Sequence, residues 1–168
     1  EYWYDSAFLG NGKLGLMIYK EPGKNYLRLE TGNCDVHDHR TKRDVFGIPR
    51  LLTGHFALHP KGKIINGTIH LDLWNAEAST DITTTKGVIH LRSFVHADEM
   101  MIIVKATTEG DEHDFQWEWI AAEANSPRYL IFKRQGKANK IPKDYELNPT
   151  AKISNGKEIN LSVQKLLA

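Results

Sequence analysis

The strongest constraint on the fold of this chain is an alternation of apolar and polar residues with a period of two, which sends successive side chains to opposite faces of a β-sheet. Leu14, Leu16 and Ile18 share one face of such a segment, and Leu27 and Leu29 repeat the pattern a few residues later. The alternation predicts strands over residues 13–19, 26–30, 55–59, 65–73, 89–96, 100–107 and 114–119, with weaker candidates at 129–133 and 159–163.

The strands are expected to form antiparallel sheets. No segment of helical length carries an apolar stripe at the i, i+3, i+4 spacing, so parallel α/β folds are excluded and an all-β antiparallel sandwich or barrel is left. Residues 100–107 are apolar on both faces near the middle, which predicts a strand between two packed layers. Turn-forming residues predict hairpin-style links at 21–24, 60–63, 85–87 and 109–111.

The length of 168 residues is that of one domain. The chain starts without an initiator methionine or the apolar region of a signal peptide, and it ends within an apolar run that has no strand or helix terminator. We therefore expect residues 1–168 to be a single amino-terminal β domain, or part of one, taken from a longer protein.

Charge and cysteine content exclude several classes of partner and site. The chain has 22 Lys and Arg against 21 Asp and Glu, for a net charge of +1, and it has no basic run that would attract nucleic acid or an anionic membrane. No apolar stretch approaches the roughly 20 residues of a membrane-spanning helix. The single cysteine, Cys34, excludes an internal disulfide and a zinc site built from cysteines.

The first candidate site is the glycine-rich turn at residues 10–15. A phosphate-binding loop needs a strand before it and a helix after it, whereas here a strand follows. The Asn11-Gly12 pair is typical of a tight turn with positive φ that enters a strand. The alternative interpretation is that Asn11 faces a ligand.

The second candidate is the polar segment at residues 33–40, within a long aperiodic loop at 32–54. Its Asp and His side chains could hold a metal ion, although their spacing matches no known ligand motif. A loop held together by Asp–Arg pairs is an alternative, and so is a sugar site, since planar polar groups bind hydroxyls. The candidate residues are Asp35, Asp38, His39 and Arg40.

Aromatic and imidazole side chains provide the remaining candidates. Trp74, at the end of a predicted strand, and Trp3 could stack on a sugar ring. Phe115, Trp117 and Trp119 alternate along one strand, as core residues do. We expect half-exposed imidazoles on the polar strand faces at His55, His59, His70, His90 and His96.

Several of these segments together resemble the amino-terminal β domain of α-L-fucosidase-like glycoside hydrolases and their uncharacterised bacterial relatives. The segments are LGNGKLGLMIY at 9–19, LRL at 27–29, NCDVHDHR at 33–40, GVIHLRSFVH at 87–96, and the apolar strand at 100–104. In that family a GNG-x-x-G turn opens the domain and an Asn-x-Asp-x-Trp-type segment follows. His37 departs from this pattern, because the family tends to have Trp at its position.

The resemblance implies a mutarotase-like β-supersandwich that packs through its loops against an (α/α) toroid, which carries the catalytic carboxylates. It implies that Asn11, Asp35, Asp38, His39 and Arg40 face that toroid or the rim of its pocket. The function we expect is that of a non-catalytic domain in an exported bacterial glycoside hydrolase, periplasmic or secreted. This chain alone would be inactive, with no cofactor, no metal and no catalytic residue.

The expected partners are the downstream catalytic domain and carbohydrate, with no nucleic acid and no membrane. Two alternatives remain at this point. One is a free-standing carbohydrate-binding module whose sugar platform is Trp3, Trp74 and the loop at 35–40. The other is an interaction domain whose polar loop docks a partner protein.

Overall fold

A computed structural model describes residues 3–37, 50–122 and 134–136 of the chain. The chain divides into two compact units, one formed by residues 1–32 and 55–120 and the other by residues 33–54 and 121–168. The first unit holds almost all of the described secondary structure. The candidates at Asp38, His39 and Arg40 and the weaker strand predictions at 129–133 and 159–163 lie outside the described residues.

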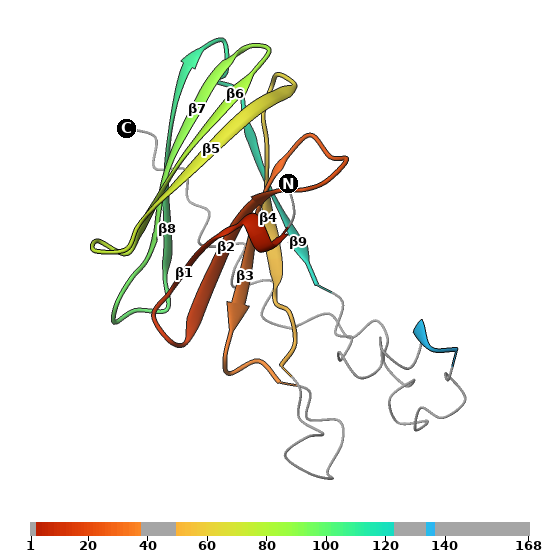
Figure 1. Ribbon diagram of the computed structural model, residues 1–168, viewed down its shortest axis with the longest axis vertical. Coiled ribbons are helices and arrows are strands. Elements are labelled where there is room, and N and C mark those ends of the chain that lie inside the picture. The colour runs from red at the N-terminus through yellow and green to blue at the C-terminus, as the bar shows by residue number, and fades with distance from the viewer. Residues whose placement is uncertain (1–2, 38–49, 123–133, 137–168) are drawn as a thin grey trace. The chain divides into compact units, whose positions relative to one another are not determined.

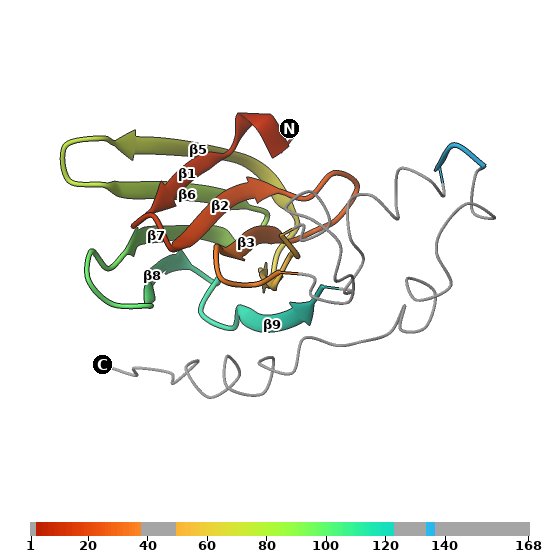
Figure 2. The same ribbon diagram turned by 90° about the horizontal axis from the view of Figure 1, so that it is seen from below.

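Two antiparallel sheets packed face to face form the first unit, as Figures 1 and 2 show, so the predicted all-β antiparallel β-sandwich is confirmed. A three-residue 3₁₀ helix, η1 (Trp3–Asp5), precedes the strands. The five-stranded sheet has the order β1-β2-β3-β4-β9 and the four-stranded sheet the order β5-β6-β7-β8. The strands are β1 (Ala7–Gly10), β2 (Leu14–Lys20), β3 (Leu27–Asn33), β4 (Gly54–His59), β5 (Ile64–Asp72), β6 (Glu77–Thr84), β7 (Gly87–Val95), β8 (Ile102–Gly110) and β9 (Gln116–Ala121).

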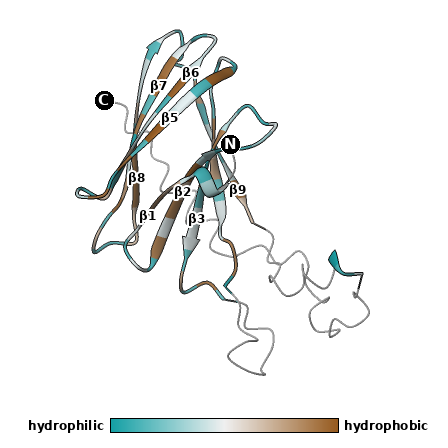
Figure 3. Ribbon diagram, viewed as in Figure 1, coloured by the Kyte–Doolittle hydropathy of each residue, from teal (hydrophilic) through white to brown (hydrophobic). Residues whose placement is uncertain are grey.

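The core lies between the two sheets and consists largely of the alternate apolar residues that the sequence pattern singles out, joined by residues of β1 and β6. The five-stranded sheet contributes Leu16, Ile18 and Leu29, and the four-stranded sheet contributes Ile89 and Leu91. Burying each such side chain contributes about 1.5–3 kcal/mol to stability. Figure 3 shows the apolar residues at intervals along the strands, and the predicted aromatic stripe packs against this core through Phe115 and Trp117.

Strands β1 and β6 were not predicted, and both lack the signal on which the prediction rests. In β6 the buried positions are Ala78, Thr80, Ile82 and Thr84, so its inward face alternates correctly but is made mostly of small or hydroxyl side chains. In β1 the largest apolar residue, Phe8, points outward while Ala7 and Leu9 are buried. Apolar periodicity detects neither strand.

The predicted alternation is wrong at the start of β5. A bulge shifts the register between Ile64 and Asn66, so Ile64 packs against the core and Ile65 is displaced and 65% exposed. The strand at 100–107 is also placed differently from expectation. It begins only at Ile102 and forms a sheet edge, while Met100 and Met101 are exposed in the preceding turn.

Two of the predicted hairpin links instead carry the chain from one sheet to the other. Residues 60–63 lead from β4 to β5, and residues 111–115 lead from β8 to β9. The fully buried Glu112 joins them, because its carboxylate accepts hydrogen bonds from Lys61 N at 2.9 Å and Gly62 N at 2.7 Å and from the Thr84 hydroxyl. A Cβ at Gly62 would lie 2.6 Å from Glu112 Oε1, so only glycine fits there. The predicted turns at 21–24 and 85–87 do join neighbouring strands of one sheet.

Within the described ranges, no helix is long and apolar enough to cross a membrane.

Candidate functional site

The side-chain amide of Asn11 forms hydrogen bonds with four backbone groups. Its Oδ1 accepts hydrogen bonds from Lys13 N at 3.0 Å and Leu14 N at 2.8 Å, and its Nδ2 donates to His96 O at 2.9 Å and Glu99 O at 3.1 Å. These bonds use both N–H groups and both lone pairs of the amide. Asn11 therefore ties the β1–β2 turn to the β7–β8 turn, and with Gly12 at a φ of 89° the geometry favours the turn interpretation.

Trp74 lies in the turn between β5 and β6 and is 94% exposed. Asp72 orders this turn, because its carboxylate accepts hydrogen bonds from Trp74 N at 3.0 Å and Asn75 N at 3.1 Å. Ala76 completes the turn at a positive φ of 52°. The indole is thus presented to solvent from an ordered turn, while Trp3, the other proposed stacking residue, lies in η1.

Asp35 belongs to the second unit. Its backbone N donates to Asn33 Oδ1 at 2.8 Å, and its Oδ1 accepts from Cys34 Sγ at 3.5 Å. A β-bridge joins His37 to Arg50, so the two ends of the long loop run antiparallel where they are described. Of the six candidates, the structure describes Asn11, Asp35 and Trp74, and Asn11 and Trp74 stand on different turns. No group of three or more His, Cys, Asp or Glu side chains in the described part of the chain could hold a metal ion.

The densest set of interacting polar and aromatic side chains lies elsewhere, on the outer face of the five-stranded sheet. We call it the polar row. It runs across β2, β3, β4 and β9 and includes two residues of the β2–β3 turn region, so its members are Tyr19, Glu21, Tyr26, Arg28, Glu30, His55, His59 and Glu118. Strand alternation places these residues outward because Leu16, Ile18, Leu29 and Leu58 point inward.

Arg28 is the centre of the part of the polar row that lies on β2, on β3 and in the turn between them. Its Nη1 donates to Glu21 Oε2 at 2.9 Å, its Nε lies 3.3 Å from Glu30 Oε2, and its guanidinium lies 5.8 Å from the centre of the Tyr19 ring. The Tyr19 hydroxyl donates to Glu30 Oε2 at 2.8 Å. Burial and this bond to a carboxylate raise the pKa of Tyr19, and the two carboxylates outweigh burial to raise that of Arg28.

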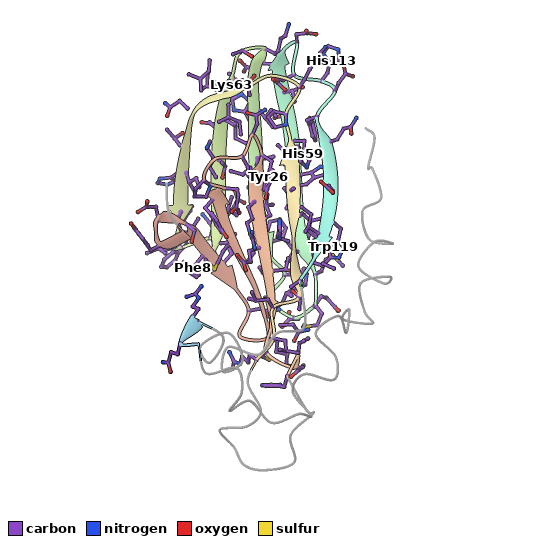
Figure 4. The ribbon with its side chains drawn as sticks, turned by 90° about the vertical axis from the view of Figure 1, so that its right-hand side faces the viewer. Phe8, Tyr26, His59, Lys63, His113 and Trp119 are labelled. Atoms are coloured by element: carbon purple, nitrogen blue, oxygen red, sulfur yellow. The ribbon has the colours of Figure 1, made fainter. Side chains whose placement is uncertain are left out.

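The rest of the polar row consists of Tyr26 and the residues on β4 and β9. It is more exposed to solvent at His59 and Glu118, and it combines an aromatic ring with imidazoles. The Tyr26 ring lies 5.2 Å from the His59 ring and 6.2 Å from the His55 ring, centre to centre. His59 Nε2 is 2.9 Å from Glu118 Oε2, and both of these side chains are open to solvent. Figure 4 shows Tyr26 and His59 next to each other on this face.

His55 differs from the half-exposed imidazole that the sequence predicts. It is buried, and its Nε2 has no hydrogen-bond partner among the residues that the structure describes. Burial, with the positive charge of Arg28, lowers the pKa of His55 and favours the neutral ring. The expectation of a half-exposed ring holds for His59 and His90.

Sequence reasoning placed each strand of the polar row but did not single out the row. The available signal was weak: outward positions of the predicted strands at 13–19, 26–30, 55–59 and 114–119 carry Tyr, Arg, Glu and His. Only the strand order brings these positions together, since β3 and β4 are separated by a long loop and β9 by a further sheet.

Comparison of the chain with protein-family models, with curated proteins and with solved structures finds no match.

Proposed function

We propose that this chain is the non-catalytic β-sandwich domain of an exported glycoside hydrolase and that it presents the polar row to carbohydrate. The resemblance of the turn at 9–15 and the segments at 27–40 and 87–104 to glycoside hydrolase β domains supports the first part. The second part rests on one observation, the grouping of Tyr26, His59 and Glu118 at the open end of the row.

The chemistry of a sugar suits this end of the row. A pyranose has an apolar face that packs on an aromatic ring and hydroxyls that need several directional donors and acceptors. Tyr26 offers the ring, and Glu118 offers carboxylate oxygens beside the His59 imidazole. Arg28 is already paired with Glu21 and Glu30. These neighbouring side chains are therefore held in place before a ligand arrives, which lowers the entropy cost of binding.

Titration of the chain against a panel of glycans tests this proposal. We expect at least one glycan to bind in the micromolar to millimolar range, and Tyr26→Ala to weaken binding about tenfold, since 1.4 kcal/mol corresponds to a factor of ten. His59→Ala should weaken it by a few fold. His90→Ala is the matched control, because His90 on the opposite sheet is also carboxylate-paired and similarly exposed.

A wild-type chain that binds no glycan in the panel contradicts the carbohydrate role. Equal losses from His59→Ala and His90→Ala contradict the placement of the site on the five-stranded sheet.

The parent protein offers a separate test. The reading frame downstream of Ala168 should encode long, paired helical segments that carry the catalytic carboxylates, and the chain alone should not hydrolyse glycosides. A reading frame that stops near Ala168 contradicts the role as an enzyme domain and leaves a free-standing carbohydrate-binding module as the function.

A further inference from the structure

Strand β5 is an unusual edge. It is nine residues long and ends the four-stranded sheet, as Figure 2 shows, and no described strand pairs with its outer side. Natural sheet edges are normally protected by charge, by proline, by bulges or by being short, and the bulge of β5 at Ile65 leaves residues 66–72 regular. The edge strands β8 and β9 carry charged residues and β1 has only four residues, whereas residues 64–71 of β5 contain no Asp, Glu, Lys or Arg.

The backbone of β5 has a defined set of outward-facing groups. Thr85 N donates to Lys63 O at 2.9 Å, so Lys63 faces β6. Antiparallel strands alternate the direction of their backbone groups, and the bulge at Ile65 shifts this alternation by one residue. Gly67, Ile69 and Leu71 therefore direct their N–H and C=O groups to the free edge.

Exposed apolar side chains accompany this edge. Ile65 and Ile69 lie on β5, Ile69 being 36% exposed, and the turn that follows presents Leu73 and Trp74. Four of the exposed large apolar residues of the described chain are therefore contributed by a single segment, residues 65–74. A segment that exposes this many apolar side chains beside an edge that no described strand covers indicates an interaction surface.

We propose that β5 pairs in antiparallel fashion with β5 of a second copy of this chain, about a two-fold axis at Ile69. In this register Ile69 faces Ile69 of the other copy and Gly67 faces Leu71. Every apolar side chain between residues 66 and 72 thus meets an apolar side chain or a glycine. The outward backbone groups of Gly67, Ile69 and Leu71 form about six hydrogen bonds across the axis.

The strand selects a second copy because it is complementary to itself. Asn66 faces Asp72 of the other copy and Thr68 faces His70, so polar residues meet polar residues on the opposite face. Like charges meet nowhere between residues 66 and 72, since Asp72 is the only Asp, Glu, Lys or Arg in that range and His70 faces Thr68. The result is an isologous contact that extends two four-stranded sheets into one continuous sheet.

The mass of the whole chain in solution, measured by light scattering after gel filtration, tests the proposal. Wild type should have twice the monomer mass at about 100 µM, a concentration chosen to exceed the micromolar dissociation constants of weak dimers. Ile69→Lys and Ile69→Glu should each be monomeric, because each places like charges at the axis. An equimolar mixture of the two variants should regain the doubled mass.

Met100→Lys is the control, since it adds a charge at an exposed apolar residue on another turn and should leave the dimer intact. A monomeric wild type overturns the proposal, as does an Ile69→Lys variant that stays dimeric. Failure of the mixture to regain the doubled mass, with both variants folded by circular dichroism, overturns the axis at Ile69. Glycan binding is a separate readout that Ile69→Lys should not change.

Discussion

The outer faces of the two sheets carry similar residue types but organise them differently. On the five-stranded sheet Arg28 is shared by two carboxylates, one of which also accepts the Tyr19 hydroxyl, and the Glu30 side chain is only 15% exposed. On the four-stranded sheet Arg92 pairs with Glu77 and is 68% exposed. His90 is also shared by two carboxylates, those of Asp81 and Glu109, but these side chains are 58% and 71% exposed.

The difference shows that the contribution of a charge pair to stability depends on how far the pair is buried. A solvated pair gains little because water screens it, whereas partly buried charges are costly when a partner is removed. We therefore expect the polar row to behave as one coupled network, and the Arg92 and His90 groups on the other face to act independently of each other.

Glu112→Ala should have the largest effect, because it removes the link between the two sheets. Two backbone N–H groups would lose their acceptor, that of Gly62 in a buried position and that of Lys61 in a partly buried one. We expect the free energy of unfolding in urea to fall by about 3 kcal/mol or more. Glu112→Gln, which keeps one acceptor oxygen, should cost clearly less. A loss no greater than that of a surface substitution would contradict the role of Glu112.

Arg28→Met keeps the aliphatic stem but leaves Glu21 and Glu30 without their cation. We expect it to lower the free energy of unfolding by about 2–3 kcal/mol, toward the low end of what breaking a buried ion pair costs. Arg92→Met on the opposite face should lower it by clearly less. Similar losses from the two variants would remove the distinction between the faces.

Tyr19→Phe removes one hydrogen bond to Glu30 and should cost about 1 kcal/mol. In the double variant with Arg28→Met the cost should differ from the sum of the single costs, because both residues act on Glu30. The matched pair on the four-stranded sheet, His90→Ala with Arg92→Ala, should be additive. Additivity in both pairs would argue against a network.

The smallest effect is a pH dependence of opposite sign on the two faces. Burial, reinforced by Arg28, lowers the pKa of His55 below its ordinary value of 6.5, whereas the bond to Asp81 raises the pKa of His90 above it. The stability associated with neutral His55 is present above pH 6.5 and is lost as the pH falls through its lower folded-state pKa. The stability from His90 is present below pH 6.5 and is lost as the pH rises through its higher one.

NMR titration of the imidazole signals should show the two rings on opposite sides of 6.5. In urea unfolding, His55→Gln should remove a loss of stability at low pH, and His90→Gln should remove a gain. Shifts of the same sign would contradict the assigned environments.

Whether a strand can be predicted from the sequence depends on which side chains it buries. β2, β3 and β7 each place at least two Leu, Ile or Val side chains inward at consecutive alternate positions, and their prediction succeeds for that reason. β6 fails because Ile82 is the only large apolar side chain on its inward face, beside Ala78, Thr80 and Thr84, and a hydroxyl in a core gives no hydropathy signal. The bulge at Ile65 and the crossing of the chain at Gly62 were equally invisible, since each depends on contacts with residues distant in sequence.

The candidate site shows the same contrast between features set by neighbouring residues and features set by contacts between distant residues. Local chemistry indicated the turn at Asn11 correctly, because Asn and Gly determine that conformation within a few residues. The polar row could not be assembled, because Arg28 and His59 become neighbours only through the pairing of β3 with β4.

The sequence by itself determined the all-β class, the positions of most strands and which of their faces is buried, because side-chain alternation is a local property of an extended backbone. Only the three-dimensional structure reveals the order of the strands in each sheet, the sharing of Arg28 by two carboxylates and the position of β5 at the edge of the described sheet. These depend on pairing between residues far apart in the chain, and alternation is the same whichever strand lies alongside.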